Sequence, residues 1–167
     1  MASDTAPPAP TPPPGQPRGQ PQLLVRAQYV KDLSFENPGA PKSLARRDGQ
    51  PEIAVNVDVT GNRLSPNQYE LVLAITATAR TGGETTFIAE LVYGAVMSVE
   101  NVPIERAEPL VLIEGPRLLF PFARNIMADL TRDGGYPPLL LQPMDFAALY
   151  RRHLERQAAE KPATPPN

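Results

Sequence analysis

The sequence contains no cysteine and only one histidine, His153. The absence of cysteine excludes disulfides, thiolate metal sites and cysteine nucleophiles together. A metal site or a serine-based catalytic triad would have to rely on His153 without a second histidine. Gly82-Gly83 is not followed by the lysine of a phosphate-binding loop, so it indicates a hairpin turn instead. We therefore expect a protein that is not an enzyme and that needs no metal or other cofactor.

Long apolar runs are also missing. No run approaches the roughly 18 residues that a membrane-spanning helix needs, and residues 1–20 lack the apolar core of a signal peptide. Basic stripes interleaved with aromatic residues, which are typical of nucleic-acid binders, are absent, and residues 22–150 carry 15 acidic against 11 basic side chains. We expect a soluble, cytoplasmic protein that neither inserts into membranes nor binds nucleic acid.

Proline, in contrast, is abundant, with 22 in 167 residues, and eight of these lie within residues 1–21. Both ends of the chain lack the apolar side chains whose burial would offset the entropy lost on ordering. We therefore expect a disordered proline-rich tail over residues 1–21, one folded domain over residues 22–158, and a second disordered tail over residues 159–167.

The first half of this domain has the pattern of β-strands. Apolar and polar residues alternate in segments bounded by turn-forming residues, at residues 22–30 running into 32–36, and at 53–59, 69–80 and 85–99. The sequence Thr60-Gly61-Asn62 is expected to end the second strand, and Gly82-Gly83 to join the last two. Four strands joined by short turns predict an antiparallel sheet.

The second half has helical spacing. Residues 100–116 contain three prolines and are interpreted mostly as a connection, followed by a helix that begins near Leu119, with Pro121 in its first turn. Gly134-Gly135 is expected to end that helix, and Asp145 to cap a second one. Strands followed by helices predict an α+β fold: a four-stranded antiparallel sheet followed by two helices packed on one face.

Two features point to binding. The strand at 85–99 is apolar on both faces, because Ile88, Val92 and Val96 lie on the face opposite its buried one, around Glu90. Either a partner or subunit covers that face, or the strand is central in a monomer. Apolar residues also occur in connections, notably Leu139-Leu140-Leu141. Such segments either cover the core or line a groove that accepts many apolar side chains.

Several motifs, in order along the chain, resemble the SecB family. They are residues 31–41 (KDLSFENPGAP), 50–52 (QPE), 119–124 (LFPFAR), and 134–137 (GGYP) followed by Leu139, Leu141, Pro143, Asp145-Phe146 and Leu149-Tyr150. The resemblance covers about residues 24–156. One departure is Gly49, where the family commonly has an aromatic residue that forms part of a groove wall.

The resemblance implies an ATP-independent holdase. It would keep unfolded secretory precursors competent for translocation and deliver them to the SecA motor. It also implies a homotetramer, a dimer of dimers whose sheets pair across subunits. An alternative is an adaptor on the same fold that binds one dedicated partner, such as an antitoxin.

The resemblance further implies two sets of site residues. Motor docking would use Asp32, Glu36, Ile88 and Glu90. Carboxylates there would give a salt-sensitive encounter with a basic partner. Client segments would bind in an apolar groove that includes Leu44, Val102, Ile104, Phe146 and Tyr150.

Overall fold

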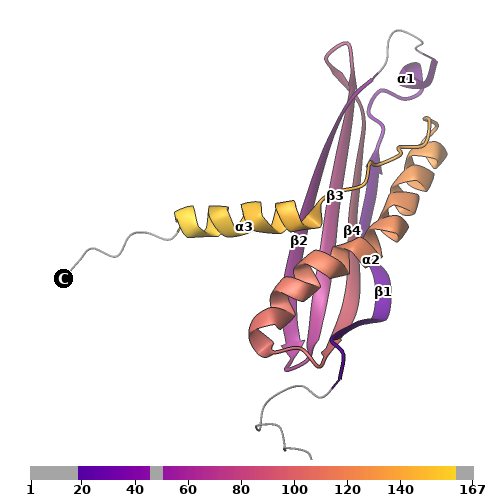
Figure 1. The fold of residues 1–167 in the computed structure, drawn as a ribbon. Helices are drawn as coiled ribbons and strands as arrows, with labels where there is room; N and C mark the ends of the chain where they lie inside the picture. The colour runs from indigo at the N-terminus through magenta and orange to yellow at the C-terminus, as the bar shows by residue number, and fades with distance from the viewer. Residues whose placement is uncertain (1–18, 46–50, 161–167) are drawn as a thin grey trace, which may run out of the picture.

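A computed structural model describes residues 19–45 and 51–160 of the chain (Figure 1). The elements, in chain order, are β1 (Gln22–Glu36), α1 (Lys42–Ala45), β2 (Glu52–Ser65), β3 (Gln68–Thr81), β4 (Glu84–Glu100), α2 (Ile104–Asp133) and α3 (Phe146–Glu160). The four strands form one antiparallel sheet in the order β1-β4-β3-β2. This confirms the predicted α+β fold. Pairing of sheets between subunits stays a prediction.

Buried and half-buried residues alternate along β3, and this alternation shows which face of the sheet packs on the core. Every second residue from Tyr69 to Ala79 is buried, on the face of the sheet that α2 crosses, and the residues between them are half-buried. The hairpin to β4 uses Gly82 and Gly83, whose φ angles of 60° and 83° belong to a turn that disfavours other residues. Both features confirm the sequence-based expectation.

The edge strand β1 contains two bulges. Its register against β4 shifts between Val25 and Ala27 and again between Val30 and Asp32. Each bulge inserts one residue and therefore reverses which residues face α2. After the second bulge, Phe35 pairs with buried Ala89 on the α2 side, and Asp32 faces the opposite side.

Two predicted boundaries are wrong. β2 does not end at Thr60-Gly61-Asn62 but continues to Ser65. Gly61 lies inside β2 close to α2 rather than in a turn, since a Cβ atom there would lie 2.9 Å from Leu112 Cδ2.

The second error concerns α2, which begins at Ile104 rather than near Leu119 and contains three prolines inside it. Pro121 is consequently deep in the helix and not in its first turn. Each internal proline removes a backbone hydrogen bond. The helix forms nevertheless because a stripe with a spacing of four residues is buried against the sheet: Ala107, Val111, Gly115, Leu119, Ala123, Met127 and Thr131.

Helix α2 runs diagonally over the sheet (Figure 1). Near its start Leu112 packs on Gly61 of β2, and just past its end Gly134 packs on Phe35 of β1. The corner of the sheet at the beginning of β2 is therefore not beneath α2. Within the described ranges, 19–45 and 51–160, no helix is both long and apolar enough to span a membrane.

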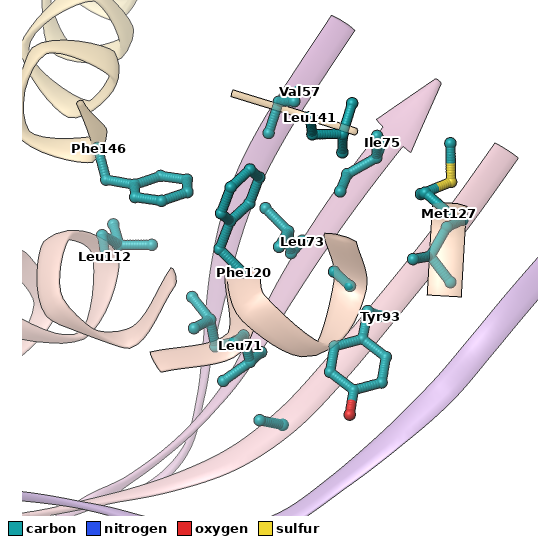
Figure 2. Packing of buried hydrophobic residues seen from close by; sticks show 14 of the residues in the cluster. Val57, Leu71, Leu73, Ile75, Tyr93, Leu112, Phe120, Met127, Leu141 and Phe146 are labelled. Carbon is teal, nitrogen blue, oxygen red and sulfur yellow. The ribbon is translucent and has the colours of Figure 1, made fainter. Parts of the chain in front are cut away.

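Helix α3 starts against α2 and then projects beyond the β2 edge of the sheet (Figure 1). Asp145 caps it as predicted, because its Oδ1 accepts a hydrogen bond from the Ala148 amide at 3.0 Å. That bond is the main cause of the lowered pKa of the Asp145 carboxyl. Phe146 and Phe120 close the core at this point (Figure 2).

Candidate functional site: an acidic sheet face and an apolar groove

The structure places Asp32, Glu36, Ile88 and Glu90 on the face of the sheet opposite α2, and we call this set the acidic face. Glu36 pairs with Ile88, and Glu90 pairs with Ser34. Ser34 Oγ donates to Glu90 Oε2 at 3.3 Å. Because side chains of paired residues share a face of the sheet, the four predicted docking residues form one patch. Asp32 belongs to it because of the second bulge of β1.

The negative charge of this patch is not neutralised within the described part of the chain. Asp32, Glu36 and Glu90 are exposed and form no ion pair there. Farther along the same face, Glu70 binds Lys31 Nζ at 2.7 Å and accepts the Tyr29 hydroxyl at 2.7 Å. Net negative charge is therefore concentrated at the end formed by Asp32, Glu36 and Glu90.

The Glu70 cluster fixes the middle of this face. Its hydrogen bond from Lys31, followed by that from Tyr29, lowers the pKa of the Glu70 carboxyl. The same bond from Tyr29 raises the pKa of that phenol. Tyr29 reaches β3 by lying across Gly94 of β4, where a Cβ atom would come within 2.6 Å of its ring. Gly94 thus makes room for a contact that spans three strands.

The second feature is a groove of about 670 Å³ on the α2 side, at the end of the sheet near the β3–β4 hairpin. We call it the apolar groove. Its lining comes from the loop after β1, the start of β2, the hairpin and the segment after α2: Gly39, Lys42, Ser43, Pro51, Ile53, Thr81, Glu84, Thr85, Thr86, Phe87, Tyr136, Pro137, Pro138, Leu139 and Leu140.

Aromatic rings form the floor of the groove. Phe87 and Tyr136 have centroids 5.0 Å apart, and Phe35, on the same face of the sheet, stacks on Phe87 at 5.6 Å. The Tyr136 hydroxyl lies 2.7 Å from Asn37 Oδ1 and 2.9 Å from Ser43 Oγ. These bonds hold the half-buried Tyr136 ring in place at the groove, whereas the Phe87 ring is only 3% exposed.

Apolar side chains also stand exposed in the walls. Leu140 is 62% exposed and Ile53 is 41% exposed. The Leu139 amide donates to Thr131 Oγ1 of α2 at 2.9 Å, which anchors this wall to the helix. The two alternatives for the Leu139-Leu140-Leu141 segment both occur, because Leu139 and Leu140 line the groove whereas Leu141 is buried in the core.

The five predicted client residues are not brought together in one groove. Leu44 is exposed beside the apolar groove, next to Gly135. Val102 and Ile104 lie at the start of α2, and Ile104 is exposed. Phe146 is 2% exposed in the core, and Tyr150 lines a small hollow between β2 and α3. Their part in client binding stays a prediction, and Gly49 lies outside the described residues.

The groove residues that sequence reasoning missed come from distant parts of the chain. The alternation along β4 predicts that Phe87 is buried, and it is 3% exposed where it borders the groove. Ile53 has the same pattern of a buried residue but is 41% exposed, because alternation cannot show that α2 leaves this corner of the sheet open. Tyr136 stood out only as part of a motif. Among residues 19–45 and 51–160, no group of three or more acidic or histidine side chains could hold a metal ion.

Comparison with known proteins gives one consistent result. The family model described as "Preprotein translocase subunit SecB" matches residues 16–157. A relative from Rhodopseudomonas palustris (strain BisA53), named "Protein-export protein SecB", is 52% identical over 94% of this chain and 96% of its own length. A relative of the same name from Bradyrhizobium diazoefficiens is 52% identical over 89% of this chain and 91% of its own.

One solved structure also has a similar fold. It is a SecB-like chaperone from Mycobacterium tuberculosis in complex with a peptide from an antitoxin. The TM-score is 0.56 at 16% sequence identity, and the match covers 73% of this chain and 90% of that one. At this identity the comparison supports the fold.

Proposed function

Because the chain belongs to the SecB family, we propose that it is a cytoplasmic protein-export chaperone that holds unfolded precursors in the apolar groove and delivers them to SecA through the acidic face. The observation that carries this proposal is the groove itself, whose exposed Leu140 and Ile53 offer apolar surface to a ligand. Proteins of this family are chaperones, which supports the interpretation that the chain is not an enzyme.

The groove suits segments of an unfolded chain. Its volume of about 670 Å³ falls in the range of ligand-binding clefts. The apolar lining binds through burial, which contributes roughly 25 cal/mol per Å² and requires no particular sequence. Beside Ile53, β2 is an edge strand, so its free backbone groups could pair with an extended client segment. Folded proteins hide apolar segments and would be ignored.

Assembly into a homotetramer would strengthen weak contacts. Several grooves engaged by one long client raise the apparent affinity by orders of magnitude through effective concentration. Leu118 and Phe122 support assembly, because they are exposed one turn apart on the side of α2 away from the sheet.

The acidic face suits a basic partner segment. Exposed carboxylates steer association and make it depend on salt, and Ile88 adds apolar contact. This supports SecA docking on the side of the sheet opposite the groove. Client and motor could then be bound together.

The experiment is suppression of aggregation of a denatured precursor without nucleotide, together with light-scattering mass measurement. We expect a tetramer that suppresses aggregation. Leu140→Ser should weaken the suppression of aggregation. Leu64→Ser should not, because Leu64 is exposed at the end of β2 that lies away from the groove. A monomer that fails to slow aggregation would contradict the proposal.

The same assay separates the proposal from the adaptor alternative. Unrelated unfolded chains should compete with one another for a general holdase. An adaptor for one dedicated partner would bind that partner and ignore the others.

A further inference from the structure

The extra residues of the two β1 bulges are both basic. The register of β1 against β4 passes over Arg26 and Lys31, so each is the extra residue of its bulge. Arg26 forms an ion pair with Glu100 of β4 at 3.0 Å, and Lys31 forms one with Glu70 of β3 at 2.7 Å. Each extra residue is therefore fixed by its side chain rather than by strand pairing.

The Glu70 cluster holds β1 on both sides of Val30. The Lys31 ammonium and the Tyr29 hydroxyl both donate to Glu70 Oε1, each at 2.7 Å. The Glu70 side chain is only 17% exposed, so water competes weakly for these bonds. The cluster therefore fixes the side chains of Tyr29 and Lys31 on the face of the sheet opposite α2.

The fixed positions of Lys31 and Phe35 make a bulge necessary. Phe35 lies on the α2 side, where it stacks on Phe87 at 5.6 Å. Positions 31 and 35 are four apart, so regular alternation would put both side chains on one face. The bulge reconciles them, and its consequence is that the neighbours Lys31 and Asp32 both project from the face opposite α2.

Strand pairing alone does not decide which residue is the extra one. If Asp32 were extra and Lys31 lay opposite Val92, Tyr29 and Phe35 would keep their present faces. Asp32 would then lose its paired position opposite Val92, two residues along β4 from Glu90. The bond between Lys31 and Glu70 favours the arrangement in which Lys31 is extra and Asp32 is paired.

We propose that Tyr29, Lys31 and Glu70 are positioning residues for docking: they keep Lys31 as the extra residue and thereby hold the Asp32 carboxylate at the acidic face. A basic docking segment then meets Asp32 already in place and loses less conformational entropy on binding. Lys31 thus strengthens binding of a basic partner although its own charge repels that partner. This inference rests on the proposed function, since it concerns the docking site.

The sign of the effect of Lys31 separates positioning from simple electrostatics. Lys31→Met removes a positive charge beside Asp32, so charge alone predicts tighter binding of a basic partner. We expect weaker SecA binding instead, by about threefold in calorimetry with the full-length protein, the effect of ordering roughly one side chain. Lys31→Arg keeps a cation and its reach to Glu70, and it should restore the wild-type affinity.

Arg26→Met is the matched control for Lys31→Met. It removes the corresponding cation and ion pair at the first bulge, and it leaves the Glu70 cluster intact. This variant should not weaken SecA binding. An equal loss in Arg26→Met and Lys31→Met would show that the loss of either cation has this effect, and it would overturn the assigned role of Lys31.

Tyr29→Phe tests the cluster without a change of charge. It removes the hydroxyl that donates to Glu70, and it should also weaken SecA binding. Its control is Tyr93→Phe, which removes a tyrosine hydroxyl that donates to Gln28 Oε1 of β1 at 3.0 Å. Tyr93→Phe leaves the Glu70 cluster intact and should bind SecA as the wild type does.

Hydrogen exchange without SecA gives a readout that general destabilisation would not reproduce. In Lys31→Met and Tyr29→Phe, the amides of residues 30–33 should exchange faster, while those of residues 23–27 keep their wild-type rates. Arg26→Met should give the reverse pattern. Thermal unfolding checks that each variant is folded, and Lys31→Gln replaces Lys31→Met if that variant is not.

The outcomes separate this inference from the proposed function. Unchanged or tighter SecA binding by Lys31→Met, or wild-type exchange at residues 30–33 in that variant, overturns the positioning role and leaves docking on the acidic face standing. Failure of the wild type to bind SecA overturns the docking function itself, and the positioning role with it.

Discussion

Phe146, the first residue of α3, meets Phe120 of α2 edge to face, with ring centroids 5.6 Å apart (Figure 2). This contact attaches the projecting helix α3 to the rest of the fold. Replacing Phe146 with alanine should destabilise the protein by about 3 kcal/mol, because a buried ring is lost and a cavity remains. Urea denaturation measures the loss, and limited proteolysis should show α3 cleaved first.

Leu154 provides the control for that experiment. It lies on α3 but is exposed, so Leu154→Ala should change stability by less than about 0.5 kcal/mol. Equal losses in the two variants would contradict the assigned role of the aromatic contact.

Gly115 of α2 tests the close approach of the helix to the sheet. A Cβ atom there would lie 2.6 Å from Leu71 Cδ2 and 3.0 Å from Met97 Cε. Helix propensity alone would make Gly115→Ala stabilising by about 1 kcal/mol. We expect the opposite sign, a loss of about 1–3 kcal/mol from overpacking, measured by chemical denaturation. A variant more stable than the wild type would mean that the Leu71 and Met97 side chains shift at little cost to accommodate the added methyl group.

Thr131 tests the anchor of the groove wall. Its buried hydroxyl donates to the Met127 carbonyl at 3.0 Å and accepts the Leu139 amide at 2.9 Å. Thr131→Val keeps the shape but leaves that amide unpaired, which should cost about 1–3 kcal/mol and weaken client binding. Thr60→Val, at an exposed position on β2, should do neither. Thermal unfolding and peptide titration compare the two variants. An unchanged peptide affinity in Thr131→Val would contradict the role of this hydroxyl in holding the groove wall.

Glu70 gives a pH-dependent prediction. Bonds from Lys31 and Tyr29 lower its pKa in the folded protein below the ordinary value of 4.5. A carboxyl of this kind stabilises the fold above its unfolded pKa and loses that contribution as the pH falls through its folded pKa. Glu70→Gln should therefore be less stable than the wild type at neutral pH, and the difference should shrink in acid. Urea denaturation at neutral and acid pH measures it. A difference independent of pH would exclude this mechanism.

The acidic face predicts a salt effect on motor binding. Asp32→Asn combined with Glu90→Gln should weaken SecA binding about tenfold at low salt and flatten its dependence on ionic strength. Glu105→Gln with Glu108→Gln removes two exposed carboxylates from α2 and should have little effect. Surface plasmon resonance across a salt series makes the comparison, and similar losses in the two double variants would argue against a localised docking patch.

The sequence predicted those parts of the fold that depend on local periodicity. The alternation along β3, the glycine hairpin and the cap at Asp145 are all formed by neighbouring residues, and the structure confirms them. The start of α2 was predicted wrongly because prolines were weighed as breakers. Burial of the stripe through Ala107, Val111 and Gly115 is a tertiary effect that outweighs them.

The candidate sites likewise combine features that local sequence predicts with features that depend on tertiary structure. The acidic residues were proposed from resemblance, but their common face depends on a bulge after Val30 that alternation does not reveal. The groove combines Ile53, Phe87 and Tyr136, which are distant in sequence. Ile53 in particular has the pattern of a core residue and is 41% exposed, because it lies on the edge strand β2 at the corner that α2 does not cover.

The two bulges of β1 make its length as important as its composition. Without Lys31, the second bulge would be lost and side chains would alternate without interruption through this point. The residues before position 31, or those after it, would then point to the opposite face of the sheet. If the later residues turned, Asp32 and Glu36 would point toward the aromatic floor and Phe35 toward water. Homologous chains can therefore vary many side chains in this strand, whereas a one-residue insertion or deletion would exchange its inner and outer surfaces.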